Sequence, residues 1–342
     1  MHKWGKYFAA AVLAGAALAA APATAVAAEG CQWSSSALPV PGGYWLEDVG
    51  GGDGAGTVAG TLRPGSPDQP RVGVLWRADE LHVAGAAFGQ DTELDDVNAA
   101  GVAVGSYSAP HVFGVPDLHH AVRYAGGTFE RLPDPPGYTN TVALAVNARG
   151  DILGAVGESA STGVYASVVW PADAPGTVDV LPVPSPGWQV QAGIADDGTV
   201  AAAAFDWSAG GDLAGYVLPE RGAAVRMASP VPTGDVVPTA ITTQRIAGYA
   251  GESGAFLWHL DGSVDRALPG LQNVAAMNSA GAIAGYANGG ATLFLPADGS
   301  PAQTVAPSGE DTRVREVTES GDLFGTATTP EHVVVPTHWH CG

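Results

Sequence analysis

The sequence predicts an all-β fold, and within that class a single seven-bladed β-propeller with four strands per blade. Two observations lead to this prediction. The chain of 342 residues contains 48 Gly and 26 Pro, a composition that disfavours long helices and favours short strands joined by tight turns. A short motif also recurs seven times, in copies that end near residues 60, 105, 154, 202, 248, 285 and 325. A period of roughly 40 to 50 residues is typical of stacked units such as propeller blades.

The motif is an apolar residue, a turn that ends in Gly, and an apolar stretch that usually ends in a second Gly, as in VNAAGVAVG from Val97 to Gly105. Its second residue is Asn in three copies, which suits a tight turn because Asn tolerates left-handed backbone and hydrogen-bonds its own backbone. The Gly that ends the turn supplies a positive φ. The first copy, VGGGDGAGTVAG from Val49, carries a three-residue insertion.

Each copy is followed by a loop of variable length, an apolar run such as AFLWH at 255–259, and in most units a stretch that ends in Leu-Pro, such as DRALP at 265–269. We therefore expect four strands per unit: one before the turn, one after it, and two more in the segments that follow. A flat β-solenoid is the alternative architecture. A closed propeller is favoured because it leaves no exposed sheet edges.

The two ends of the chain complement each other. The segment at 31–49 has the ending of an outermost strand followed by an innermost strand, whereas the C-terminal stretch EHVVVPTHWHCG supplies a third strand with no fourth. We therefore expect the N-terminal segment to close the ring by pairing with the C-terminal blade. Cys31 and Cys341, the only two cysteines, would then form a disulfide, since two cysteines in an exported chain usually pair. Free or intermolecular thiols are the alternative.

Two stretches carry the repeat pattern best, AAMNSAGAIAGYA at 275–287 and GAFLWHLDGSVDRALPG at 254–270. The pattern resembles the HAF-type extracellular repeat family of secreted bacterial proteins. The resemblance covers the chain after its N-terminal segment, although the copies at 192–204 and 317–328 are degenerate. It implies a repeat fold outside the cell, and it brings no catalytic residues with it.

Residues 1–28 are predicted to be a secretory signal peptide. Lys3 and Lys6 form a positive n-region, an apolar run from Phe8 to Ala20 follows, and small residues precede Glu29. A membrane anchor is the alternative, but the run is short for a hydrocarbon core of ~30 Å. We therefore expect a domain at 29–342 that is secreted, extracellular and not inserted into a membrane.

The net charge of the chain limits the classes of partner that it can bind. The formal net charge is −20, and after residue 28 there are 12 Arg and no Lys against 34 acidic residues. Nucleic acid requires a basic patch that releases counterions, so we expect no nucleic-acid partner. An extracellular glycan or protein is the expected partner, and a monomer the expected state.

One face of the ring should collect the candidate ligand-binding residues. It carries the loops between the second and third strands, which are long in the first four units, and the connections between blades. Variable loops on a rigid scaffold often carry function, and aromatic residues beside polar groups suit a sugar or a peptide. Packing between blades is the alternative role. The candidates are Tyr44, Trp45, Tyr107, His111, Phe113, His119, Tyr138, Trp188 and Trp207.

Carboxylates break the repeat on the innermost strands. The residue before the first apolar residue of the motif is Asp48, Asp96 or Glu316 in three units and Ala or Gly in the other four. Ring closure makes these three units neighbours, so we expect their side chains to face the central channel together. Close carboxylates raise one another's pKa or recruit a cation. A calcium site, an acid/base pair and a water-filled acidic wall are therefore all open interpretations.

The last strand carries three histidines, His332, His338 and His340. His338 and His340 share one face of a strand and are candidates for a metal site, with surface decoration as the alternative. No cofactor is firmly implied. The sequence lacks a Gly-x-Ser-x-Gly elbow, a His-Glu-x-x-His motif and a Walker loop, while a dispersed Ser-His-Asp set stays open.

The leading functional interpretation is a secreted β-propeller that binds an extracellular glycan or protein through its loop face without catalysis. One alternative is an extracellular hydrolase or lyase acting on polysaccharide or peptide, in which the channel carboxylates transfer protons. The other is a structural cell-surface or spore-coat protein. The fold by itself does not choose among these three classes.

Overall fold

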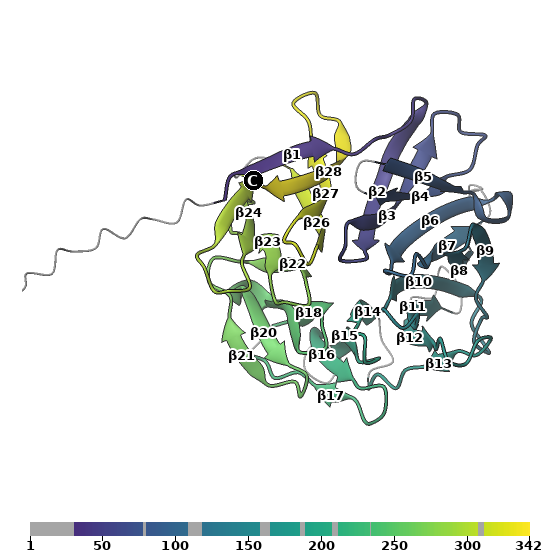
Figure 1. Ribbon diagram of the computed structural model, residues 1–342. Coiled ribbons are helices and arrows are strands. Elements are labelled where there is room, and N and C mark those ends of the chain that lie inside the picture. The colour runs from purple at the N-terminus through teal and green to yellow at the C-terminus, as the bar shows by residue number, and fades with distance from the viewer. Residues whose placement is uncertain are drawn as a thin grey trace, which may run out of the picture. The chain divides into compact units, whose positions relative to one another are not determined.

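The computed structural model describes residues 31–77, 80–108, 118–157, 165–184, 189–206, 211–232, 234–306 and 311–342. In these ranges 28 strands form seven antiparallel sheets of four strands each, set around one central axis (Figure 1). The described helices are two 3₁₀ turns, η1 (Ala87–Gly89) and η3 (Gly251–Ser253). No described helix has the length and apolar character needed to cross a membrane. The predicted fold class is confirmed.

In each of the first six blades, chain order runs from the innermost strand to the outermost. Blade 1 is β2 (Tyr44–Gly52), β3 (Thr57–Pro64), β4 (Val72–Arg77) and β5 (Glu80–Gly85). Blade 2 is β6 (Asp91–Val97), β7 (Ala103–Ser108), β8 (His119–Ala125) and β9 (Thr128–Arg131). Blade 3 is β10 (Asn140–Val146), β11 (Ile152–Gly157), β12 (Tyr165–Trp170) and β13 (Asp179–Val180). Blade 4 is β14 (Gln189–Ile194), β15 (Val200–Asp206), β16 (Asp212–Leu218) and β17 (Val225–Arg226).

The last three blades follow the same order. Blade 5 is β18 (Val236–Ile241), β19 (Arg245–Ala250), β20 (Ala255–His259) and β21 (Val264–Ala267). Blade 6 is β22 (Asn273–Met277), β23 (Ile283–Tyr286), β24 (Thr292–Leu295) and β25 (Gln303–Ala306). Blade 7 is β26 (Thr312–Val317), β27 (Leu323–Thr328), β28 (Val334–Cys341) and β1 (Trp33–Ala37).

Blade 7 closes the ring with strands from both ends of the chain, as Figure 1 shows. β1 pairs antiparallel with β28, so that Trp33 lies opposite Cys341 and Ala37 opposite Thr337. Both cysteines are disulfide-bonded, and because the chain has no others they are bonded to each other. The predicted closure and the predicted bridge are both confirmed.

Every innermost strand contains a β-bulge near its middle, where its register against the second strand shifts by one residue. The second Gly of the motif lies against this bulge. A Cβ at Gly325 would sit 1.9 Å from the carbonyl oxygen of Arg313, and one at Gly105 would sit 2.0 Å from that of Glu93. Gly is therefore favoured at this position because the two backbones approach too closely for a side chain, and blade 4 is the exception, with Ala202 there.

Of the two reasons expected for the Asn of the motif, its hydrogen bonds to its own backbone are confirmed and a left-handed backbone is not. The positive φ of the turn belongs to its Gly, as at Gly101 with φ 74°, whereas no Asn in the described residues has a positive φ. The expectation that these Asn residues are chosen for left-handed backbone is therefore wrong. Asn98 Oδ1 accepts the amide of Val102 in its own turn at 3.1 Å, while its Nδ2 donates to the carbonyl of Asn147 in the next blade at 2.9 Å.

Neighbouring blades bury their apolar side chains against each other. One cluster joins Val104 and Leu132 of blade 2 to Val146, Ile152 and Trp170 of blade 3. Buried Trp residues on the third strands also donate an indole N–H to the preceding blade: Trp76 to Pro39, Trp170 to Pro133 and Trp258 to Ala228, at 2.8 to 2.9 Å between Nε1 and the carbonyl oxygen. The core is thus a ring of interfaces between blades, which fixes the spacing of the innermost strands.

Candidate functional site: the central channel and its mouth

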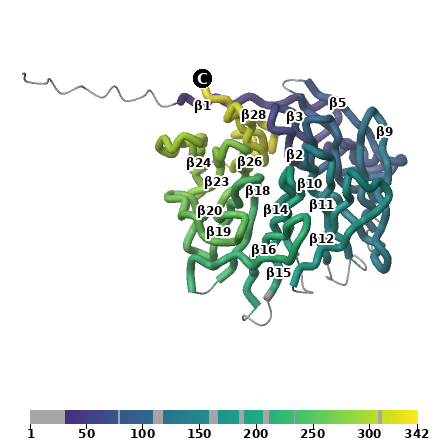
Figure 2. The backbone as a smooth tube through the Cα atoms, turned by 60° about the horizontal axis from the view of Figure 1, so that its bottom comes forward, coloured from purple at the N-terminus to yellow at the C-terminus, as the bar shows by residue number. Residues whose placement is uncertain are grey.

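The antiparallel order of the strands gives the ring two distinct faces. The turns between first and second strands lie on one face, named here the turn face, together with the turns between third and fourth strands. The opposite loop face carries the connections between second and third strands and those between blades. The strands run between these two faces in Figure 2.

The innermost strands of all seven blades surround a central cavity of about 410 Å³. Two successive residues of most of these strands line it, at and just after the bulge, as with Asp95 and Asp96 or Arg315 and Glu316. A bulge produces this pattern because its extra residue interrupts the alternation of side chains between the two faces of a strand. The bulge therefore doubles the number of side chains that each strand can present to the channel.

The three carboxylates grouped by the sequence, Asp48, Asp96 and Glu316, all line this cavity. Each one bonds a neighbouring blade. Oδ2 of Asp96 accepts the amide of Val146 in blade 3 at 2.8 Å, and its Oδ1 accepts the amide of Val97 at 2.9 Å. Oε2 of Glu316 in blade 7 accepts the amide of Gly52 in blade 1 at 3.3 Å.

Asp48 is paired across the same boundary between blades 7 and 1. The guanidinium of Arg315 lies 3.2 and 3.3 Å from its two carboxylate oxygens. Both side chains keep about half of their surface exposed, so solvent weakens the pair. The acidic residues that break the repeat therefore link blade 7 to blade 1 and blade 2 to blade 3 beside the channel.

The glycine run of the first motif, which carries the three-residue insertion, leaves space for these carboxylates because it has no side chains. A Cβ at Gly51 would lie 2.5 Å from Oδ1 of Asp96, and a Cβ at Gly52 would lie 3.0 Å from Cγ of Glu316. A Cβ at Gly50 would lie 2.3 Å from the carbonyl oxygen of Asp95. The glycine run therefore passes close to the acidic residues of blades 2 and 7, where side chains would collide with them.

Asp95 and Arg315 were not among the residues chosen from the sequence. Alternation along a strand would turn them away from the side that carries Asp96 and Glu316, and only the bulge brings them into the cavity. Asp95 has no hydrogen-bond or ion-pair partner for its carboxylate within the described residues. It is therefore the channel acid whose oxygens are not already bound to the scaffold.

The cavity raises the pKa of its acidic groups. Burial is the largest cause for Asp95, followed by the charges of Glu93 and Asp48, and its pKa rises to about 8. Burial likewise raises the pKa of Glu316 to about 8, with the charge of Asp96 adding to the effect. The pKa of Asp96 rises to about 7, because the two amide donors offset part of the cost of burial. By accessible surface the three residues are only partly buried, and they line the central cavity.

A groove of about 700 Å³ lies at the mouth of the channel on the loop face, over blades 4 to 7. It shares Arg315 and Thr239 with the channel cavity, so the two spaces adjoin. Burial raises the pKa of the phenols of Tyr249 and Tyr286 above its ordinary value. The hydrogen-bonding side chains along the groove include those of Gln191, Asn273, Asp311 and Arg313.

The groove does not contain the aromatic residues predicted to bind ligand. Tyr107 is 7% exposed and contacts the rings of Phe88 and His120. Tyr44 and Tyr138 are half-buried and pack against the apolar clusters between blades. These three tyrosines therefore pack within the scaffold, which is the alternative role considered for them.

Two further candidate residues, Trp45 and His119, are more exposed to solvent than Tyr107. Trp45 on the innermost strand of blade 1 is 64% exposed. His119 is half-buried, and its Nδ1 lies 3.5 Å from Oγ of Ser106. Its backbone amide donates to Oδ1 of Asn140 in blade 3 at 2.9 Å. The remaining candidates, His111, Phe113, Trp188 and Trp207, lie outside the described residues.

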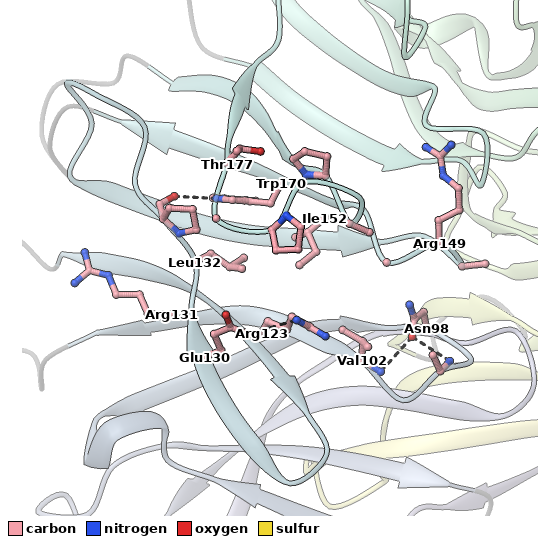
Figure 3. Close-up of a pocket in the computed structure, with 18 of the residues that line it drawn as sticks. Asn98, Val102, Arg123, Glu130, Arg131, Leu132, Arg149, Ile152, Trp170 and Thr177 are labelled. Carbon is pink, nitrogen blue, oxygen red and sulfur yellow. Dashed lines mark hydrogen bonds and ion pairs between the residues drawn. The ribbon is translucent and has the colours of Figure 1, made fainter.

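The turn face carries a larger cleft of about 720 Å³ between blades 2 and 3, shown in Figure 3. Three arginines line it, and each is paired with a carboxylate: Arg123 with Glu130, Arg131 with Asp134, and Arg149 with Asp151 and Glu220. Its buried Trp170 makes the same indole–carbonyl bond that recurs in blades 1 and 5. The arginines of this cleft are thus neutralised by carboxylates, and its Trp170 bond recurs in other blades as part of the scaffold. The groove at the channel mouth is therefore the better candidate for a ligand-binding site.

Comparison with protein-family models found no match, and comparison with curated proteins by sequence found none either. Solved structures do match. The β-propeller domain of the Trilobed protease from Pyrococcus furiosus has a TM-score of 0.56 at 9% identity over 86% of this chain and 95% of that one. YCF48 from Cyanidioschyzon merolae has a TM-score of 0.53 at 12% identity, over 90% and 98% of the two chains.

A puromycin-hydrolyzing peptidase from Mycobacterium tuberculosis matches with a TM-score of 0.53 at 11% identity, over 90% of this chain and 51% of that one. At these identities the likeness shows the propeller fold and nothing of the chemistry. The Trilobed protease domain is described as having an open velcro topology, whereas here β1 closes blade 7 and a disulfide joins the chain ends.

Proposed function

We propose that this protein is a secreted β-propeller that binds an extracellular glycan in the groove at the channel mouth and does not convert it. The observation that carries the proposal is the groove itself, about 700 Å³ in volume and lined by two phenols together with amide, carboxylate and guanidinium groups. Hydroxyl-rich ligands are recognised by such donors and acceptors beside aromatic rings. The strongly acidic chain disfavours polyanionic ligands, so a neutral or cationic glycan fits best.

The hydrogen bonds of the channel carboxylates favour a binding function over a catalytic one. Asp96 and Glu316 accept backbone amides of neighbouring blades, and Asp48 is paired with Arg315. A general acid or base has to reach the substrate with a free oxygen, whereas both oxygens of Asp96 and Oε2 of Glu316 accept backbone amides and Asp48 faces a guanidinium. The inferred role of the three carboxylates is therefore to stabilise the scaffold beneath the ligand.

A hydrolase or lyase is the second candidate, and Asp95 is the observation in its favour. Its carboxyl lines the cavity, has no partner within the described residues, and has a pKa of about 8. A protonated carboxyl at neutral pH is suited to general-acid catalysis. The third class, a structural surface protein, predicts that the groove binds no small ligand.

A glycan array followed by product analysis on the same glycans separates these functions. We expect bound glycans to be recovered unchanged, and Arg313→Ala or Tyr249→Ala to weaken binding at least tenfold. Arg123→Ala, in the cleft on the turn face, is the matched control and should bind normally. Cleavage products that Asp95→Asn abolishes would establish the hydrolase or lyase instead. Retention of full binding by both groove variants would show that the groove is not the site.

A further inference from the structure

A cluster far from the channel mouth combines three groups with metal-ligand chemistry. Asp322 lies in the turn before β27, and His338 and His340 lie on β28. One ligand atom from each residue lies within 4.8 Å of the other two. All three residues belong to blade 7 at its turn face, where β28 runs to the C-terminus that Figure 1 labels.

The sheet register explains why these residues meet. Phe324 pairs with His338, and Leu323 with Trp339, across β27 and β28. Continuing this register by one residue places Asp322 opposite His340. Because side chains alternate along a strand, His338 and His340 project on the same side of β28, while Trp339 between them is buried in the core.

The carboxylate of Asp322 lies between the two imidazole rings. Its Oδ1 is 2.7 Å from Nδ1 of His340, and its Oδ2 is 3.5 Å from Nε2 of His338. The ring of His338 stacks on Phe324 with a centroid distance of 4.4 Å and an interplanar angle of 3°. This stacking constrains the plane of the His338 ring.

One of these nitrogens is left without a hydrogen bond. Nε2 of His338 is buried and has no hydrogen-bond partner among the described residues. A buried polar atom that lacks a partner is costly to a folded protein. A metal ion held between His338 and Asp322 would bind the lone pair of this nitrogen.

We propose that Asp322, His338 and His340 bind a divalent first-row transition metal ion of the zinc class. Two imidazole nitrogens and one carboxylate oxygen suit such an ion, whereas calcium prefers oxygen ligands alone. Ligand atoms around a tetrahedral Zn²⁺ lie roughly 3.3 Å apart, given bonds of ~2.0–2.1 Å. The side chain of His340 is 58% exposed and is free to make the small adjustment required. Three protein ligands leave one coordination position open.

The position of the site gives the ion a role in ring closure. β28 pairs with β1, and both histidines lie within the paired stretch, His340 opposite Ser34 and His338 opposite Ser36. The bound ion ties β28, the strand on which β1 pairs to close the ring, to the turn that precedes β27, next to the disulfide at Cys341. We therefore infer that the metal stabilises the closed form of blade 7.

The test is titration of the EDTA-treated, disulfide-intact protein with ZnCl₂, followed by calorimetry and thermal unfolding, with CaCl₂ as the comparison. We expect one Zn²⁺ per chain and a melting temperature that rises with the logarithm of zinc concentration above the dissociation constant. Co²⁺ bound in place of zinc should give visible absorption that reports nitrogen and oxygen ligation. Absence of binding and of any shift at millimolar zinc would overturn the proposal.

Variants then assign the ligands. His340→Gln and Asp322→Asn each change one partly exposed ligand and should weaken zinc binding at least tenfold, as measured by calorimetry. His332→Asn is the matched control: this histidine is exposed on the same blade, has a positive φ of 61° that Asn tolerates, and lies outside the cluster. Equal zinc affinity in all three variants, each shown to be folded, would place the ion elsewhere and contradict the assignment.

Discussion

The carboxylate of Asp96 in blade 2 accepts the backbone amide of Val146 in blade 3, with 2.8 Å between Oδ2 and the nitrogen. Its other oxygen accepts the amide of Val97 at 2.9 Å. Both valines are buried, so these amides have little access to water. The side chain that interrupts the repeat on the innermost strand is thus a hydrogen-bonded connection between two blades, beside the channel rather than free within it.

Replacement of Asp96 by Ala should therefore destabilise the ring. It leaves two buried amides without an acceptor, at a cost of about 1–3 kcal/mol in the free energy of unfolding. Asp48→Ala is the matched control on the corresponding strand of blade 1. It removes only an exposed ion pair with Arg315, which is worth ~1 kcal/mol or less. Equal small losses in urea unfolding would show that the Asp96 carboxylate does not connect the blades.

The raised pKa of Asp95 predicts an unusual dependence of stability on pH. The folded-state value is about 8, above an unfolded value near ~4, so between these values the native state binds more protons than the unfolded state. Stability should therefore fall as pH rises from about 4 to about 8.

Asp95→Asn should remove this loss. We expect it to stabilise the protein at pH 8.5 by roughly 1–3 kcal/mol, less than the full shift because channel water screens part of it, and to have little effect near pH 4. The exposed Asp68→Asn serves as control. A stability difference between Asp95→Asn and the parent protein that stays constant across this pH range would contradict the prediction.

Gly325, at the end of the motif in blade 7, should tolerate no side chain. Gly325→Ala places a methyl group 1.9 Å from the carbonyl oxygen of Arg313, and relief of such a clash requires backbone movement that costs ~1–3 kcal/mol or more. Gly42→Ala meets no atom within 4 Å and should be close to neutral. Thermal unfolding of both variants checks the comparison, and similar melting temperatures would refute the close-approach explanation.

Opening the disulfide should weaken the closure of blade 7. Cys31→Ala, or reduction, removes a cross-link between chain ends and should cost about 2–5 kcal/mol. Mass spectrometry of non-reduced peptides should recover Cys31 and Cys341 in one linked pair. Alkylation of both thiols without prior reduction would show instead that they are free.

The interpretation of the channel carboxylates as a calcium site can be tested by adding calcium. Because Asp96 and Glu316 already accept backbone amides and Asp48 faces Arg315, we expect millimolar CaCl₂ to shift the melting temperature no more than MgCl₂ does. A selective rise that is lost in Asp95→Asn would identify a calcium site in the cavity.

The sequence by itself determined the repeat, the strand order and the closure. These follow from local chemistry: most units carry the same turn and the same close-approach glycine, and all carry similar apolar strands, so the period of the motif is the period of the fold. The incomplete last unit and the matching N-terminal strand predicted where Cys31 meets Cys341. Asp48, Asp96 and Glu316 also stood out, because they replace Ala or Gly at a position that repeats.

The tertiary structure alone decided which side chains meet. A β-bulge makes the side chains of Asp95 and Arg315 face the channel, and a pattern of alternating residues does not predict such a bulge. Arg315 and Asp48 are 267 residues apart and became partners because the ring brings blade 7 beside blade 1. Asp322 joined His338 and His340 through strand register. Such contacts depend on how whole blades stack, and the free energy of that stacking comes from apolar interfaces spread over many residues that no short motif encodes.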